Sequence, residues 1–334
     1  MQTAGKSFPD ITEGTEDNRM SLEVKNLTKH YGEKLVLDHL SFTMPGPGVY
    51  ALLGTNGAGK TTAIRMMLGM LARDEGEALW NGAPLRLENC NVGYLAEERG
   101  LYPKYTLLDQ LLYFASLRGV SKTDAMGRIR YWSGRLETDE YLFPQRRGPR
   151  GTTVTGSSLK ADQLSKGNQQ KIQLMLALLS DPELLILDEP LSGLDPVNTD
   201  LFKSILREEI GKGKYLILSS HQMATVEEFC TDITILNRSR TILQGNLNEI
   251  KKSYGRVHLL LKTEQDAEQI IRAAGIEPFS EKPREYQLRV TGETQANDLL
   301  RRLAEAGITV VTFDLKEPSL HEIFVEKVGQ ADAE

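Results

Sequence analysis

The sequence predicts an α/β protein with a buried parallel sheet, antiparallel strands near its start, a helical segment in its middle and a second, smaller α/β unit. Three observations support this prediction. Short apolar runs such as "GVYALLG", "ELLILDE" and "GKYLILSSH" alternate with helical patterns, as strands buried on both faces do. A glycine-rich loop joins the first of these runs to a helical pattern. After about residue 253, short amphipathic strands and helices follow each other closely.

The larger unit is predicted element by element. Residues 21–31 and 35–44 alternate apolar and polar side chains and predict two antiparallel strands. Residues 48–54 predict the strand before the glycine-rich loop, and 61–71 show helical spacing after it. From about 106 to 180, leucines and aromatic residues recur three and four positions apart, which predicts mainly helix. Further short apolar strands are predicted at 183–189, 213–221 and 232–243.

The smaller unit is predicted from alternating strands and helices. Strands are expected at 257–262, 286–291 and 308–315, and helices at 264–275, 296–307 and 318–329. A boundary near Ser253 gives a larger domain at 21–250 and a small accessory domain at 254–330. Residues 1–20 contain several acids and no apolar core, which excludes a signal peptide and predicts a disordered tail.

Composition narrows the class of protein. With 334 residues the chain should hold about two domains. Its longest apolar run, about six residues, is far short of the roughly 18 that span a bilayer. Cys90 and Cys230 have no neighbouring His or Cys, which favours a buried apolar role in a reducing compartment over a disulfide or metal site. The net charge of −6 disfavours nucleic acid as a partner. The basic segment "QRRGPRG" (145–151, with Arg146, Arg147 and Arg150) is predicted to be a solvated loop rather than an anion-binding patch.

The glycine-rich loop "GTNGAGKTT" (54–62) indicates a nucleotide site. It matches the pattern G-x-x-x-x-G-K-[ST] in full and lies between a strand and a helix, as that pattern requires. The glycines let backbone N–H groups converge on a phosphate. Lys60 supplies a positive charge to the β- and γ-phosphates, and Thr61 offers a hydroxyl to Mg²⁺.

Two acids follow a later strand in "LLILDEP" (184–190). Asp188 stands at the end of this buried strand, where a carboxylate can hold Mg²⁺ directly or through water. Glu189 comes next and is well placed to polarise or orient an attacking water. Acids also end strands for structural reasons alone, but the phosphate-binding loop favours the functional interpretation.

A second helix start with an anion-binding character occurs at "LSKGNQQK" (164–171). Ser165 can cap the helix, and a Lys-Gly-Asn turn with Gly167 leads into the buried run "IQLMLALL" (172–179). A helix start with a capping hydroxyl and a glycine suits an anion, although an ordinary helix cap has the same composition.

These motifs, with "SGLD" (192–195) and "SSH" (219–221), occur in the order seen in the nucleotide-binding domains of ABC transporters, which residues 21 to about 245 resemble. The segment "EPSLHEIFVEKVG" (317–329) resembles the C-terminal extension of bacterial export-type ABC ATPase subunits. The resemblance implies a P-loop NTPase core with antiparallel β and helical subdomains of the ABC ATPase type, and ATP and Mg²⁺ as cofactors.

The resemblance also implies roles for single residues. Two such domains pack head to tail, so Ser165 and Gly167 would contact the γ-phosphate of the ATP held by the neighbouring P-loop. Tyr31 matches the aromatic residue that stacks on adenine, His221 the switch histidine, and Asp195 the acid that communicates between the two sites. By the resemblance, Glu189 and His221 are catalytic. Thr61, Asp188 and Glu97 are expected to bind the metal. Further contacts with ATP are expected from Gly54, Asn56, Gly57, Gly59, Lys60, Thr61 and Thr62.

Three departures from the family pattern are present. The family's signature segment is Leu-Ser-Lys-Gly-Asn (164–168) in this sequence. In it, Lys166 replaces the usual glycine and Asn168 replaces the usual glutamine. Glu97 stands where most relatives carry the glutamine that senses Mg²⁺. The link before the signature (143–162) is longer than the family leads us to expect, and we predict an unstructured insertion at the edge of the helical subdomain.

Together these features predict an ATP-hydrolysing subunit that dimerises around two ATP molecules and powers a separate transmembrane permease, an exporter. Its expected partners are that permease and a second ABC ATPase subunit, in a homodimer or a heterodimer, with no nucleic acid. Its expected location is cytoplasmic, on the inner face of the cell membrane. Two alternatives are a soluble ABC-type ATPase of translation or DNA repair and a regulatory module without turnover. The single P-loop and acidic charge argue against the first, and Glu189 and His221 against the second.

Overall fold

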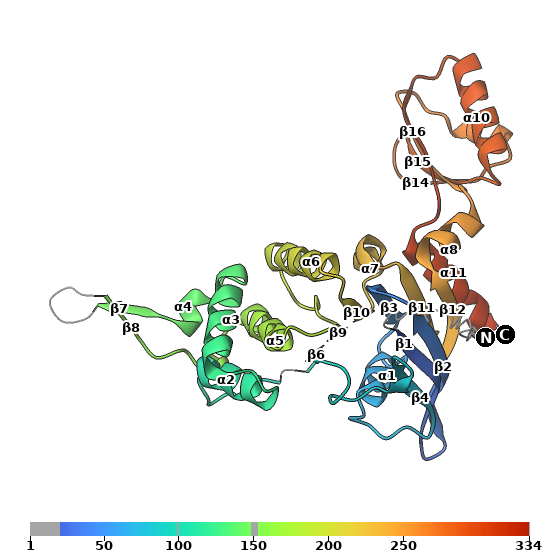
Figure 1. The fold of residues 1–334 in the computed structure, drawn as a ribbon. Coiled ribbons are helices and arrows are strands. Elements are labelled where there is room, and N and C mark those ends of the chain that lie inside the picture. The colour runs from blue at the N-terminus through green and yellow to red at the C-terminus, as the bar shows by residue number, and fades with distance from the viewer. Residues whose placement is uncertain (1–20, 99, 148–152, 334) are drawn as a thin grey trace, which may run out of the picture.

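The computed structural model describes residues 21–98, 100–147 and 153–333, so the tail predicted at 1–20 and Arg150 lie outside the described residues. The chain forms a main body, a helical lobe on one side of it and an accessory unit that stands away from it (Figure 1). We use "main body" for the elements from β1 to β6 and from β9 to α8, and "accessory unit" for residues 258–316.

An antiparallel sheet begins the main body, as the sequence predicts. Its order is β2-β1-β4-β5, and β1 pairs with both β2 and β4. Alternate residues of β1 and β2, among them Leu22, Val24, Leu40 and Phe42, are buried in a core shared with α1. The strands are β1 (Leu22–Tyr31), β2 (Lys34–Met44), β4 (Glu75–Trp80) and β5 (Ala83–Pro84).

The central sheet has the order β12-β11-β3-β10-β9-β6 and is parallel except for β12. Cores on both faces explain the continuous apolar strands, since Leu52 and Ile186 face one core while Leu53 and Leu187 face the other. The parallel register brings the carboxyl ends of β3, β10 and β9 to one edge. The strands are β3 (Gly48–Gly54), β6 (Val92–Leu95), β9 (Leu184–Asp188), β10 (Tyr215–Ser220), β11 (Asp232–Asn237) and β12 (Arg240–Asn246).

The segment 232–243, predicted as one strand, is a hairpin. Its two-residue turn consists of Arg238 and Ser239, with φ of 45° and 72°. Positive φ at both positions is the geometry that matches the twist of a tight hairpin, and it is usually marked in a sequence by Asn-Gly. An Arg-Ser turn carries no such signal, which is why the reversal was not predicted.

Helices cover the central sheet and form the lobe (Figure 1). Several begin at a residue whose side chain accepts a hydrogen bond from a backbone N–H three positions on, namely Thr106, Ser121, Ser165 and Asp195. The lobe contains α2, α3, α4 and the start of α5. The helices are α1 (Lys60–Met67), α2 (Leu107–Leu117), α3 (Lys122–Arg135), α4 (Asp139–Leu142), α5 (Lys166–Leu178), α6 (Pro196–Gly211), α7 (Met223–Phe229) and α8 (Leu247–Tyr254).

The insertion before the signature has secondary structure, which corrects our prediction of an unstructured segment. Strands β7 (Gln145–Arg147) and β8 (Thr153–Thr155) pair as an antiparallel hairpin that projects from the lobe (Figure 1). At its base, the backbone N of Gly156 donates to the carbonyl oxygen of Pro144 at 2.6 Å. Alternation of "TVT" is too short to identify a strand from the sequence, so the partner strand decides the conformation here.

The accessory unit is an antiparallel sheet in the order β14-β15-β13-β16 with its own apolar core. The first strand of that order, β14, was not predicted, because a proline and charged residues interrupt its pattern. One face of the sheet packs on α9 and α10 through residues such as Leu261 and Leu299. The elements are β13 (His258–Thr263), α9 (Glu268–Ala273), β14 (Pro278–Lys282), β15 (Glu285–Arg289), α10 (Glu293–Glu305) and β16 (Val310–Lys316).

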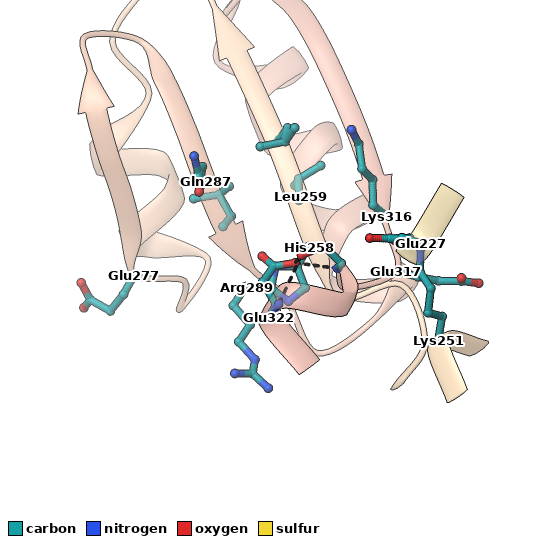
Figure 2. A pocket seen from close by; sticks show the side chains of 13 residues that line it. Glu227, Lys251, His258, Leu259, Glu277, Gln287, Arg289, Lys316, Glu317 and Glu322 are labelled. Carbon is teal, nitrogen blue, oxygen red and sulfur yellow. Dashed lines mark hydrogen bonds and ion pairs between the residues drawn. The ribbon is translucent and has the colours of Figure 1, made fainter. Parts of the chain in front are cut away.

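Helix α11 (Leu320–Ala333) leaves the accessory unit and returns to the main body, where it contacts α7 and β12. Leu320 is fully buried in the main-body core, and its backbone N donates to Glu227 of α7 at 3.2 Å. A cavity of about 550 Å³ lies at this junction, and Glu322 of α11 is 2.9 Å from His258 there. Figure 2 shows the side chains that line it. The accessory unit is therefore joined to the rest of the chain at two points, after α8 and before α11.

Candidate nucleotide site

The glycine-rich loop between β3 and α1 has a backbone that other residues cannot adopt without strain. Gly54, Gly57 and Gly59 have φ of 151°, 81° and 108°. A Cβ atom on Gly54 would lie 2.4 Å from the carbonyl oxygen of Leu236, and one on Gly59 would lie 2.7 Å from that of Val36. Glycine is required at these two positions by both conformation and space.

Lys60, the first residue of α1, turns its side chain back into this loop. Its Nζ donates to the carbonyl oxygens of Gly54 at 2.8 Å and Thr55 at 3.3 Å. It also lies 3.3 Å from Oε1 of Glu189. The residue is only 5% exposed, so its charge is compensated by these partners rather than by water.

Asp188, at the end of β9, is fully buried and presents one carboxylate oxygen without a partner. Ser219 donates from Oγ to Oδ1 at 2.5 Å, whereas Oδ2 has no hydrogen-bond partner among the described residues. Burial raises the pKa of Asp188, interactions with the hydroxyls of Ser219 and Thr61 oppose this, and the charges of Glu97 and Glu189 add to the rise. A buried, unpartnered carboxylate oxygen beside other acids fits a divalent cation.

Thr61 and Glu97 lie at the same place. Thr61 Oγ1 donates to Oε2 of Glu97 at 3.4 Å. Within the described ranges, no three side chains of His, Cys, Asp and Glu converge as a preformed all-protein metal centre would require. A hydroxyl, a buried carboxylate and an exposed carboxylate suit Mg²⁺, which usually keeps several waters and takes phosphate oxygens as ligands.

Glu189 adopts a backbone conformation that is rare for its residue type. Its φ is 49°, in the left-handed region that residues other than glycine rarely adopt. Such a conformation costs about 1–3 kcal/mol and persists only where neighbours enforce it. The backbone N donates to Ser219 Oγ at 2.9 Å, and Oε2 lies 2.9 Å from His221 Nδ1. The carboxylate is thereby held between His221 and Lys60.

A cavity of about 360 Å³ runs from the loop to Tyr31. Tyr31 is 54% exposed at its rim, and Lys29 Nζ lies 5.6 Å from the centre of the tyrosine ring. Sequence reasoning missed Lys34 and Val36, although they follow Tyr31 in the same hairpin. The lining residues are Tyr31, Lys34, Val36, Asn56, Gly57, Ala58, Gly59, Lys60, Thr61, Thr62, Glu97 and Glu189.

Ser165, Gly167 and Asp195 lie elsewhere and are not among the described residues that line this cavity. Ser165 is an exposed residue that caps α5, accepting from Asn168 N at 3.3 Å. Asp195 caps α6, and the backbone N–H of Asn198 lowers its pKa. The two helix starts adjoin, because a Cβ on Gly167 would lie 3.6 Å from Nδ2 of Asn198. These three residues form a second surface of the same chain.

The fold and this site define a P-loop nucleotide-binding protein with an ABC-type lobe. Residues 37–192 match the family described as ABC transporter, and 245–328 match the C-terminal domain of DrrA1-3-like ATP-binding proteins. The uncharacterized ABC transporter ATP-binding protein YhaQ of Bacillus subtilis is 40% identical over 92% of this chain and 98% of its own length. The Nod factor export ATP-binding protein I of Sinorhizobium fredii is 29% identical over 98% of this chain and 91% of its own length.

The chain belongs to the ATP-binding proteins of ABC transporters, and such subunits hydrolyse ATP. A solved ATP-binding subunit of an ABC transporter superposes with a TM-score of 0.60 at 29% identity, covering 70% of this chain and 92% of that one. An ATP-binding cassette in its ADP conformation has the same fold, with a TM-score of 0.54 at 20% identity over 69% of this chain and 92% of that one. Across the residues that the structure describes, no helix combines the length and the apolar character needed to cross a membrane.

Proposed function

We propose that this subunit powers a separate transmembrane permease of an export system and works as a dimer that encloses two ATP molecules. The names of related proteins, which include Nod factor export ATP-binding proteins, support the export assignment. One observation carries the dimer. Glu189 contacts both Lys60 of the P-loop and His221, and Asp188 directly precedes it, whereas the exposed Ser165 and the half-buried Gly167 lie on a separate surface. In this arrangement, a second chain supplies the signature residues.

Binding of ATP uses the loop and the rim of the cavity. Backbone N–H groups at 54–62 surround the β-phosphate, and Lys60 moves its Nζ from the loop carbonyls to the β- and γ-phosphates. The exposed ring of Tyr31 stacks on adenine, with a contribution on the order of 1–3 kcal/mol by comparison with other base–aromatic contacts.

Hydrolysis uses the acids. Thr61, Asp188 and Glu97 would hold Mg²⁺, which when bound supplies positive charge to the phosphate oxygens. Glu189 accepts a proton from the water that attacks the γ-phosphorus, the bond to the bridging oxygen breaks, and ADP and phosphate result. His221 holds the Glu189 carboxylate through Oε2 and contacts the γ-phosphate.

The second chain completes the site. Ser165 and the N-terminus of α5 donate to the γ-phosphate, close to Gly167. Hydrogen bonds to charged groups contribute about 1.5–3 kcal/mol each, so several of them at each ATP stabilise the dimer. Asp195, which accepts a hydrogen bond from the Asn198 that lies near Gly167, contacts the partner and communicates between the two sites.

Complementation between two inactive variants tests this arrangement. Lys60→Ala disables the P-loop, and Ser165→Arg blocks the signature, so each homodimer has two damaged sites and should be inactive. In a mixed dimer, both defects fall in one site while the other pairs an intact Lys60 with an intact Ser165. Mixing should therefore restore ATPase activity up to that of one site, measured as phosphate release.

Two different affinity tags, one on each chain and used in sequence, purify the mixed dimers away from the homodimers before the assay. The matched control pairs wild type with a chain carrying both substitutions, which damages both sites of the dimer and should remain inactive. Equal activity of the two purified mixed dimers, or a more active control dimer, would show that Ser165 does not act on the ATP of its neighbour.

A further inference from the structure

Ser219 is a fully buried residue of β10 that faces the two acids at the end of β9. Parallel pairing places Ser219 directly beside Asp188 in the register of the two strands. Its Oγ lies 2.5 Å from Oδ1 of Asp188 and 2.9 Å from the backbone N of Glu189. A backbone N–H only donates and a carboxylate accepts, so the hydroxyl accepts from Glu189 and donates to Asp188.

We propose that Ser219 is a positioning residue for ATP hydrolysis, because its hydroxyl fixes the peptide between Asp188 and Glu189 and so orients both carboxylates. The inference rests on the roles proposed above for these two acids. Ser219 itself does not reach the nucleotide cavity, so it acts through its neighbours.

The first consequence of this bridge concerns Asp188. Because Ser219 occupies Oδ1, the carboxylate cannot rotate freely, and Oδ2 is left buried without a partner among the described residues. The oxygen that remains is the one available to a cation. Loss of the Ser219 hydroxyl would leave both oxygens of a buried carboxylate without a protein donor and free its orientation.

The second consequence concerns Glu189. Its φ of 49° is unfavourable, and the hydrogen bond from its N–H to Ser219 holds it there. This backbone conformation directs the side chain to His221 at 2.9 Å and Lys60 at 3.3 Å. A relaxed backbone would move the carboxylate away from these partners, and displacements of about 1 Å in a catalytic group can lower turnover about 100-fold.

Ser219→Ala is the direct test, with ATP and Mg²⁺ as the ligands. We expect kcat to fall about 10- to 100-fold, the range for loss of one hydrogen bond to a charged group. The Mg²⁺ concentration for half-maximal activity should rise several-fold, while KM for ATP at saturating Mg²⁺ stays within about threefold, because the loop is unchanged. Ser219→Thr keeps the hydroxyl and should restore both quantities. Ser219→Cys, with its weak donor, should resemble alanine and replaces it if the alanine variant does not fold.

Thr234→Val is the matched control. It removes a buried hydroxyl from β11 of the same sheet, 2.7 Å from the hydroxyl of Tyr50, and should lower thermal stability without changing the Mg²⁺ requirement. The proposal is wrong if the Ser219 variants behave like Thr234→Val.

Asp188→Asn and Glu189→Gln distinguish an error in the roles proposed for the two acids from an error in the role proposed for Ser219. Full turnover in both would overturn the proposed roles of the acids. Loss of turnover in both, with normal turnover and Mg²⁺ requirement in Ser219→Ala, would overturn the role of Ser219 alone.

Discussion

At the scale of single residues, Lys60 and Glu189 form a buried pair that a nucleotide would separate. Both are 5% exposed, and each has a second set of partners, the loop carbonyls for Lys60 and His221 for Glu189. A buried charge that loses its partner is strongly destabilised, so removing either residue also affects the other. Substitutions that keep shape and hydrogen bonds are therefore the most informative ones here.

Glu189→Gln keeps the size of the side chain but removes the carboxylate that we propose as the proton acceptor. We expect it to bind ATP, to lower turnover at least about 100-fold, as loss of a general base does, and to accumulate an ATP-bound dimer. Phosphate release and size-exclusion chromatography with ATP measure these outcomes. Glu98→Gln is the control. The Glu98 side chain is 83% exposed, so this variant should change neither phosphate release nor dimer formation. Near-normal hydrolysis by Glu189→Gln would show that another group activates the water.

The two cysteines give a prediction that depends on pH. Cys90 and Cys230 are buried, as the sequence predicts, and burial raises the pKa of Cys90 to about 12 and that of Cys230 well above its usual range. A raised pKa leaves less thiolate at a given pH, about one part in ten thousand for Cys90 at pH 8. Neither should react with a thiol reagent at pH 8 in the native protein, and both should react in guanidinium chloride. Rapid native labelling would contradict the structure.

At the scale of elements, the β7–β8 hairpin is separable from the lobe that carries it. The base of the hairpin is closed by the bond from Gly156 N to the Pro144 carbonyl oxygen, so the flanking backbone is already adjacent. Replacing residues 145–155 by one glycine should leave the thermal unfolding temperature and the basal ATPase activity nearly unchanged. For comparison, a second variant with a deletion of the same length within α3 should not fold. If the hairpin deletion also unfolds the protein, the hairpin is part of the lobe's core.

Helix α11 belongs by its packing to the main body. Leu320→Ala should destabilise the protein by about 2–5 kcal/mol, the usual cost of truncating a buried leucine. Val325→Ala, in the same helix but 55% exposed, is the matched control and should change the free energy of unfolding by less than about 0.5 kcal/mol. Urea unfolding measures both. Equal effects would show that α11 does not contribute to the core in solution.

Elements with a strong periodic or motif signal were predictable from the sequence, and elements defined by their partners were not. The antiparallel strands β1 and β2, the P-loop strand and the helix after it follow from local patterns. Strands β7, β8 and β14 are short and polar, so pairing rather than propensity sets their conformation. The helix predicted at 264–275 is longer than the observed α9, which begins at Glu268 and ends at Ala273.

The same distinction holds for the site. Gly54, Lys60, Asp188 and Glu189 belong to local motifs. In the structure Lys60 contacts Gly54 and Glu189, and Asp188 lies within reach of Thr61 and Glu189. The contribution of Ser219 depends on the register between β10 and β9, which no local pattern specifies. The placement of Lys34 and Val36 at the cavity depends on how the antiparallel sheet meets the P-loop. Long-range register and packing are what the sequence alone did not supply.

At the scale of the whole molecule, the accessory unit is inserted between two helices that both meet Glu227. Lys251 of α8 forms an ion pair with Glu227, and the backbone N of Leu320 donates to its other oxygen. Replacing residues 256–317 by a short Gly/Ser linker should therefore preserve ATP binding and most of the thermal stability. Removing everything after residue 253 should lower the unfolding temperature by several degrees or more, because α11 and the buried Leu320 are lost.

Thermal unfolding and nucleotide binding of the two shortened proteins test this arrangement. The reverse order of stability, with the truncated protein more stable than the one that retains α11, would show that the accessory unit and not α11 supports the main body.

The return of α11 also sets an order of events during synthesis. The ribosome releases the P-loop, the signature helix and α7 long before Leu320, and the accessory unit, with a core of its own, emerges in the interval. The packing of Leu320 next to α7 is therefore still missing while the accessory unit folds. The first domain to begin folding is thus completed last. A nascent chain halted inside the accessory unit contains every nucleotide-binding motif, but its main-body core still lacks Leu320.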